Sequence, residues 1–267
     1  MDDTFHTGSA LDPIDGRRFR WNLSDGWQQG RGAFGGIVLG TLLRAMEACE
    51  PDRARRTRSL SGEIPAPVVP GELEVAVEVL RRGGGTTFLE ARALQAGATV
   101  ARASALLASP RPAGATRTSA TPPQLPPPGE LTPLPPPSVG AAAPRFTSHY
   151  EYLPVPPYPY SGAEIAGAAG WVRERAETPR LDGPALIGLL DAWWPAALAC
   201  ERTPRPMATL TFTAELLVDP ATLDARAPFA YRAHLDGAAE GFSVEIRELW
   251  QDDVLVALNQ QVFAILA

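Results

Sequence analysis

The sequence contains an internal repeat, and this repeat is the strongest constraint on the fold. Residues 36–46 align without gaps on residues 183–193, where Leu39, Leu42, Leu43 and Ala45 match Leu186, Leu189, Leu190 and Ala192. One strand-like run precedes each stretch and four follow it. Helix-on-sheet units bury their apolar faces together, so we expect two such units to pair about a pseudo-twofold axis.

The strand-like runs indicate antiparallel sheet. The clearest run is 71–81, where Leu and Val alternate with Glu and Ala, as in a half-exposed strand. Pro65 and Pro67 interrupt an earlier run, which indicates an edge strand or a bend. Residues 88–92 also resemble residues 242–247, with one residue inserted. The runs cover residues 17–23, 58–69, 71–81, 87–94, 99–107, 170–175, 207–218, 229–235, 242–250 and 254–266.

The length of 267 residues permits two domains of ordinary size. Residues 109–145 hold 12 of the 28 prolines and little apolar material. Such a segment cannot build a core, so we interpret it as a plain spacer; a lid is the alternative. The predicted division is therefore a first domain at 1–108, a linker at 109–145 and a second domain at 146–267.

The composition excludes several classes of protein. A net charge of −6 argues against nonspecific nucleic-acid binding. The two cysteines lack metal-type spacing, so neither a zinc site nor a disulfide framework is expected. The N-terminus has no signal-peptide pattern, and no apolar stretch is long enough to span a bilayer. We therefore expect a cytoplasmic protein.

One charge, Asp191, interrupts a helix predicted for residues 184–198. Asp182 is a suitable N-cap, Pro184 suits the first turn, and Pro195 should end or kink the helix. A carboxylate in such a helix is costly unless it is hydrogen-bonded or has a chemical role. A satisfied core Asp or a polar helix end is the structural alternative. Because Arg44 occupies the matched position of the repeat, we favour a functional role for Asp191.

A Gly-rich loop, residues 30–36, precedes the first helical stretch. Gly35 and Gly36 lack the Lys-Ser/Thr of a phosphate-binding loop, and no dinucleotide fingerprint is present. Tight backbone packing where the helix begins explains these glycines equally well.

Several short segments, in order and spacing, carry a family resemblance. They are residues 34–40, 70–72, the turn at 80–88, residues 190–193, 208–210 and 253–261. The chain resembles the double-hotdog acyl-CoA thioesterases of the acyl-CoA thioesterase II (TesB-like) type. This resemblance implies an α+β fold of two tandem hotdog halves, each a central helix wrapped by a curved antiparallel sheet. It also implies hydrolysis of acyl-CoA, an activity of lipid metabolism, without a cofactor or metal.

The resemblance implies three catalytic residues in the second half. Family members use an Asp, a Thr or Ser, and a Gln, which correspond here to Asp191, Thr209 and Gln261. Many members also have a His in the first half, but residues 58–61 of this chain contain none.

Without a G-x-S-x-G elbow, the simplest mechanism is attack by water. Asp191 would accept the proton, and Thr209 and Gln261 would hold the water. Backbone N–H groups near Gly35 and Gly36 would meet the oxyanion.

Each candidate also has a structural interpretation. Thr209 alternates with Thr211 and Thr213 on one face of a strand, where threonine is common. Gln261 lies beside Asn259 and Gln260, which is typical of a solvated edge. Trp193 and Trp194 follow Asp191 and are candidates for binding the acyl group, although they and Phe212 also suit a core.

Two other functions fit the same scaffold. A non-catalytic protein that binds acyl-CoA, or an acyl chain linked to acyl carrier protein, is the main alternative. A hotdog dehydratase would need an Asp–His pair with close spacing, which is absent. We also expect a homo-oligomer, a dimer of double hotdogs, formed through exposed sheet faces.

Overall fold

The computed structural model of the chain describes residues 4–112, 118–137, 143–178 and 180–265. Both chain ends, the parts of the predicted linker at 113–117 and 138–142, and the last residue of the predicted final strand therefore lie outside the described residues.

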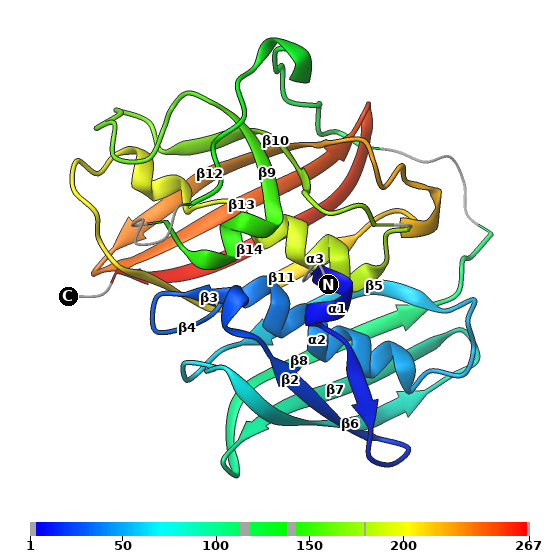
Figure 1. Cartoon of the computed structure of the whole chain (residues 1–267). Helices are drawn as coiled ribbons and strands as arrows, with labels where there is room; N and C mark the ends of the chain where they lie inside the picture. The colour runs from blue at the N-terminus through cyan, green and yellow to red at the C-terminus, as the bar shows by residue number, and fades with distance from the viewer. Residues whose placement is uncertain (1–3, 113–117, 138–142, 179, 266–267) are drawn as a thin grey trace.

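Twelve strands of the described residues form one antiparallel sheet that runs through both halves of the repeat (Figure 1). Its order is β1-β2-β6-β7-β8-β5-β11-β14-β13-β12-β10-β9. The first-half strands are β1 (Leu11–Pro13), β2 (Arg18–Leu23), β5 (Arg56–Glu63), β6 (Gly71–Arg82), β7 (Thr86–Gln95) and β8 (Ala98–Ala108). The second-half strands are β9 (Tyr150–Val155), β10 (Gly167–Glu174), β11 (Met207–Leu216), β12 (Phe229–Ala239), β13 (Phe242–Gln251) and β14 (Val254–Ile265).

The strand order is symmetric about the β5–β11 pair, which joins the two halves. Ser61 lies opposite Thr213 at the centre of this pair, and each partner strand has a register shift, Thr57/Ser59 in β5 and Thr209/Thr211 in β11. Of the two interpretations of residues 58–69, an edge strand or a bend, the edge strand is therefore wrong. Pro65 and Pro67 follow the end of β5, so they mark a bend and leave both edges of β5 free to pair.

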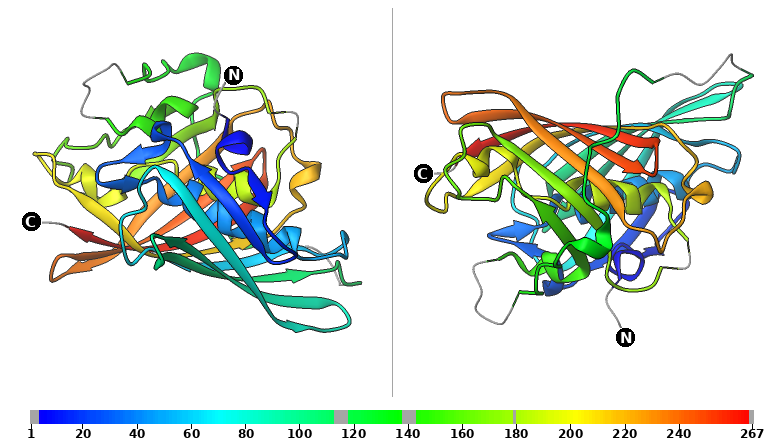
Figure 2. Two further views of the ribbon diagram at one scale, coloured as in Figure 1. Left: turned by 60° about the horizontal axis from the view of Figure 1, so that its bottom comes forward. Right: turned by 90° about the horizontal axis from the view of Figure 1, so that it is seen from above.

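Two antiparallel helices lie on one face of the sheet, and the strands curve around them (Figures 1 and 2). They are α2 (Gly35–Ala48) and α3 (Gly183–Asp191). Glycines let the two backbones approach closely: a Cβ on Gly36 would lie 3.0 Å from Gly188 Cα. Most residues of both helices are buried, which explains why the repeat preserves their leucines. The double-hotdog fold expected from the sequence is confirmed.

The remaining elements are short. They are α1 (Phe5–Gly8), β3 (Gln28–Gln29), β4 (Gly32–Ala33) and the 3-10 helices η1 (Asp25–Trp27), η2 (Pro128–Glu130), η3 (Arg145–His149), η4 (Ala196–Ala199) and η5 (Pro220–Thr222).

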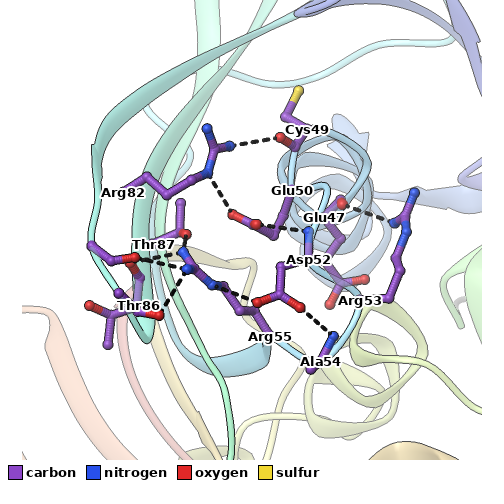
Figure 3. Close-up of polar contacts among 12 residues, drawn as sticks. Glu47, Cys49, Glu50, Asp52, Arg53, Ala54, Arg55, Arg82, Thr86 and Thr87 are labelled. Atoms are coloured by element: carbon purple, nitrogen blue, oxygen red, sulfur yellow. Dashed lines mark hydrogen bonds and ion pairs between the residues drawn. The ribbon is translucent and has the colours of Figure 1, made fainter.

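The C-terminal end of α2 is tied to the β6–β7 hairpin by a polar cluster (Figure 3). Arg55 donates to Thr87 Oγ1 at 2.5 Å and to the Gly83 carbonyl at 2.8 Å. Arg82 reaches the Glu50 carboxylate at 3.2 Å and the Cys49 carbonyl at 3.1 Å. These bonds occupy turn carbonyls and helix-end groups that have no partner within their own element.

The proline-rich segment is more than a plain spacer. Its Pro126 carbonyl accepts a hydrogen bond from Trp171 Nε1 at 2.9 Å, and its Thr121 carbonyl accepts one from Arg232 at 3.1 Å. Ala120 and Leu125 pack against a small buried cluster on the outer side of the second half. The described part of the segment is thus attached to the sheet, although it builds no core of its own.

Candidate active site

Asp191 is the last residue of α3, and only 6% of its surface is exposed. The Asp182 side chain caps the start of this helix by accepting from Ala185 N, as predicted. The helix ends earlier than the predicted residue 198, and residues beyond Pro195 form η4 instead. The reason is the missing N–H of proline, which leaves the Asp191 carbonyl without its helical partner.

The start of α2 faces the Asp191 carboxylate. A Cβ on Gly35 would lie 2.8 Å from Asp191 Oδ2, and the Gly36 N–H donates a hydrogen bond to this carboxylate. The N-cap residue Phe34 provides no side-chain cap, so the positive end of α2 is available to the carboxylate. Glycine at position 35 is required because a side chain there would occupy the space of the carboxylate.

The structure brings the three predicted catalytic residues together. Gln261 Nε2 donates to Asp191 Oδ1 at 2.8 Å and to Asn259 Oδ1 at 2.9 Å. Thr209 Oγ1 donates to Gln261 Oε1 at 3.3 Å. Gln261 therefore connects the strand threonine to the helix carboxylate through one continuous chain of hydrogen bonds.

Two of the structural interpretations are wrong for these residues. Gln261 is fully buried, so it is not part of a solvated edge. Thr209 does not share a face with Thr211 and Thr213, because the register shift between Thr209 and Thr211 reverses the alternation. The bulge turns Thr209 to the inner face, where it meets Gln261.

A buried ion pair that the sequence analysis missed adjoins Asp191. Arg247 on β13 is fully buried, and its guanidinium lies 3.7 Å from Asp191 Oδ1 and 3.2 Å from Glu245 Oε2. The same guanidinium donates to the carbonyls of Leu190 and Trp193, at 3.3 and 3.4 Å. Arg247 thus holds the backbone on both sides of Asp191.

The alternation of β13 explains why these residues were missed. Val244 and Ile246 are the apolar residues of this stretch, so the pattern places them inside and the charges outside. In the structure Glu245 and Arg247 face inward and are buried, whereas Val244 and Ile246 are less buried. In the sequence alone, two charged residues at alternate strand positions look the same whether they face the core or the solvent.

The sheet register gives the first-half counterparts of these positions. Gln261 lies opposite Glu245 and Phe212, whereas Ala105 lies opposite Leu89 and Leu60. Ala105 is therefore the counterpart of Gln261, one position from the Leu106 suggested by the sequence. Leu89 and Ala91 match Glu245 and Arg247, so the letter match between residues 88–92 and 242–247 does not follow the register. The first half has apolar residues at all three positions.

Burial raises the pKa of Asp191 to about 6. The positive charge of Arg247, followed by the hydrogen bonds from Gln261 and Gly36, opposes this effect. The site therefore holds a carboxyl group that is ionised at neutral pH and protonated in mild acid.

An aromatic wall adjoins Asp191. Trp193 stacks on Tyr231 with ring centroids 4.9 Å apart, and Tyr152 Oη donates to the Ala192 carbonyl at 2.9 Å. Trp193 is buried and Trp194 is partly buried, and the indole N–H of each has no hydrogen-bond partner among the described residues. Both predicted substrate-binding tryptophans thus pack in one aromatic cluster with Tyr152.

The first half contains a simpler carboxyl site. Glu47 on α2 accepts from Thr57 Oγ1 at 2.7 Å, and Thr57 is the register counterpart of Thr209. Glu47 lies against Gly183 at the start of α3, beside a cavity of about 210 Å³. No amide matches Gln261 there, and Asp182 already caps that helix.

Within the described residues, no group of three or more His, Cys, Asp or Glu is arranged to hold a metal ion. None of the helices described is long and apolar enough to cross a membrane.

The fold is that of a double-hotdog protein, and the hydrogen-bonded set of Asp191, Thr209 and Gln261 lies in its second half. Comparison with known families is consistent with this class: the acyl-CoA thioesterase N-terminal domain matches residues 23–108, and the acyl-CoA thioesterase C-terminal domain matches residues 122–265. The chain belongs to the acyl-CoA thioesterase family.

Solved structures show the same fold over the whole chain. A hotdog-fold protein of unknown function from Alicyclobacillus acidocaldarius is 26% identical, with a TM-score of 0.90 over 100% of this chain and 99% of its own. Acyl-CoA thioesterase II TesB2 of Mycobacterium marinum is 18% identical, with a TM-score of 0.77 over 98% of each chain. The tesB protein of Mycobacterium avium subspecies paratuberculosis is 12% identical, with a TM-score of 0.81 over 98% of each chain. None of the curated proteins compared matches this sequence.

Proposed function

We propose that this protein hydrolyses fatty or related acyl-CoA thioesters to the free acid and CoA, using a water molecule activated by Asp191, Thr209 and Gln261. The observation that carries the proposal is the continuous hydrogen-bonded chain from Thr209 through Gln261 to Asp191. Its members come from β11, β14 and α3, and the matched first-half positions hold no equivalent chain.

Asp191 is the proposed proton acceptor. Its pKa of about 6 makes it ionised at neutral pH and more basic than an ordinary Asp. The water oxygen would attack the thioester carbonyl carbon while its proton moves to Asp191. The carbon–sulfur bond then breaks, and the CoA thiolate leaves and takes up a proton.

Thr209 and Gln261 are the proposed partners of the water. The Thr209 hydroxyl donates to Gln261 and can still accept, and Gln261 Oε1 has a second lone pair, whereas the Gln261 N–H groups bond to Asp191 and Asn259. The amide already bonds to Asp191, so a water held by Thr209 and Gln261 would lie within reach of the carboxylate.

The start of α2 has two proposed roles. From the sequence we expected the N–H groups near Gly35 and Gly36 to meet the oxyanion, but the Gly36 N–H bonds to Asp191. We therefore propose that this N–H holds the carboxylate, while the positive end of α2 stabilises the oxyanion. Trp193 and Trp194 are the proposed contacts for the acyl group.

A hydrolysis screen across acyl-CoA chain lengths tests this function, with release of free thiol as the signal. The same acyl groups on acyl carrier protein form the second arm. We expect turnover of at least one acyl-CoA well above its spontaneous hydrolysis. Saturable binding of acyl-CoA without thiol release would instead support the non-catalytic acyl-binding function.

A further inference from the structure

We infer that Arg247 and Glu245 are positioning residues for Asp191: the guanidinium holds the carboxylate and its backbone, and Glu245 holds the guanidinium. This inference rests on the proposed function of Asp191. It assigns a role to two residues of β13 that neither the repeat nor the family resemblance indicated.

The Arg247 guanidinium joins three parts of the site. One nitrogen lies 3.7 Å from Asp191 Oδ1 and donates to the carbonyls of Leu190 and Trp193. These are carbonyls at the end of α3, where helical partners are missing. The guanidinium carbon also lies 5.1 Å from the centre of the Phe263 ring. Arg247 therefore fixes both the carboxylate and the chain that carries it.

Glu245 supports Arg247 from the same strand. Its Oε2 lies 3.2 Å from the guanidinium, and its Oε1 accepts from Ala197 N in η4 at 3.2 Å. Glu245 also lies opposite Gln261 in the β13–β14 register. The side chain thus connects the segment after Pro195 to the strand pair that carries the proposed water-binding amide.

Stability alone is a poor reason for this arrangement. Burying an ion pair costs several kcal/mol per ion in desolvation, and apolar replacements are often neutral or stabilising. The fold accepts such replacements, because Leu89 and Ala91 occupy the matched inward positions of the first half and are fully buried. We therefore attribute the charges of Glu245 and Arg247 to the presence of Asp191 in the second half.

The groups around Asp191 act on its pKa in opposite directions. Arg247, Gln261 and the Gly36 N–H favour the carboxylate, whereas burial and the Glu245 charge favour the carboxylic acid. Three buried tyrosines also face it, Tyr150 and Tyr152 from β9 and Tyr231 from β12, and burial raises the pKa of each phenol. They remain neutral near pH 6, so Arg247 and Glu245 are the charged pair to test.

The test is the titration of Asp191 in the full chain, followed by the ¹³C chemical shift of its side-chain carboxyl group and assigned with Asp191→Asn. Glu245→Gln leaves Arg247 with Asp191 as its anion, so the pKa should fall by a few tenths of a unit or more. Arg247→Met should raise it by about one unit or more. Arg247→Lys keeps the charge and should give an intermediate value, with a partial recovery of activity.

A pH profile of kcat/KM gives the second readout. The pH below which kcat/KM falls should shift, in each variant, in the same direction as the pKa of Asp191. The inference would be overturned if the pKa of Asp191 shifted in the same direction in all variants. It would also be overturned if this pKa did not shift in Glu245→Gln and Arg247→Lys. If Arg247→Met does not fold, those two variants still decide the result.

Different results would contradict the proposed hydrolase function and the positioning roles of Arg247 and Glu245. A wild-type protein that hydrolyses no thioester contradicts the proposed function, while the carboxyl titration still tests the positioning roles. Hydrolysis that disappears in Asp191→Asn, combined with unshifted titrations in the β13 variants, contradicts the positioning roles alone.

Discussion

The buried Asp191 and the partly buried Glu47 lie at opposite ends of the helix pair. Each carboxyl lies against the first residue of the other helix. A Cβ on Gly35 would lie 2.8 Å from Asp191 Oδ2, and a Cβ on Gly183 would lie 2.7 Å from Glu47 Oε1. Each half also places a strand threonine at the matched register shift. The protein thus contains a matched control for its own candidate site, because only the Asp191 end has the Gln261 amide and Arg247.

The rate of hydrolysis should depend on pH through Asp191. Its raised pKa of about 6 means that the base is lost as the pH falls through 6, so kcat/KM should drop about tenfold per pH unit below that value. A profile from pH 4.5 to 8 measures this limb. A rate that is flat across this range would exclude Asp191 as the base.

Stability should respond to pH in the opposite sense. Folding raises the pKa of Asp191 above its ordinary value of 3.8, so the folded state binds more protons between pH 3.8 and about 6. The free energy of unfolding from this group therefore rises as the pH falls through 6. The difference in stability between wild type and Asp191→Asn should shrink over that range. A difference that is independent of pH would mean that the carboxyl is ionised throughout.

Thr209→Ala and Gln261→Ala should each lower kcat by about 10- to 1000-fold. The double variant should lose much less than the product of the two effects, because both side chains would act on one water. Kinetics of the four proteins form the double-mutant cycle. Fully multiplicative losses would indicate that the residues act independently. Thr213→Ala is the control, since it removes a threonine from the opposite face of the same strand.

Gly35→Ala should impair activity more than folding. The added Cβ would lie 2.8 Å from Asp191 Oδ2, and this carboxylate would have to move. Gly36→Ala should mainly destabilise, because its Cβ would meet the Phe34 ring at 2.5 Å and the Gly188 backbone at 3.0 Å. Melting curves and kcat for both variants separate the two effects. Equal loss of stability in both would contradict the assignment of Gly35 to the site.

The proposed division into residues 1–108, a linker at 109–145 and residues 146–267 can be tested through the linker. Replacing residues 118–137 with Gly/Ser of equal length should cost about 1–2 kcal/mol, because it removes the packing of Leu125 and the Trp171 bond, each worth about 1 kcal/mol. Urea denaturation measures the cost. No change would restore the plain-spacer interpretation, and a loss above about 4 kcal/mol would make the segment part of the domain core.

Much of the fold follows from local sequence rules. The helix cap at Asp182, the alternation of residues 71–81 and the repeated leucines predicted both helices and most strands. The role of β5 did not follow, because pairing partners are set by tertiary contacts and Pro65 and Pro67 were compatible with either an edge or a bend. The 3-10 helix after Pro195 was missed for a similar reason: the apolar run continues past the point where the helical bonds end.

The candidate site was only partly predictable. Asp191 has a local signature, a lone charge in an apolar helix, whereas Thr209 and Gln261 came from the family resemblance. Arg247 and Glu245 were missed because strand alternation places charges outside by default. The bulge at Thr209 was also hidden, because no residue type in this strand marks the extra residue that shifts the alternation.

The most direct test of the account compares Asp191→Asn with Glu47→Gln, using turnover of the best acyl-CoA substrate and melting curves. Asp191→Asn keeps the side-chain shape but cannot accept a proton, so kcat/KM should fall by about 10²–10⁴ while stability is retained or raised. Glu47→Gln removes the carboxyl at the opposite end of the helix pair, whose pKa burial raises to about 7, and should leave turnover within about twofold of wild type. Wild-type turnover in Asp191→Asn, or an equal loss in Glu47→Gln, would contradict the proposed mechanism.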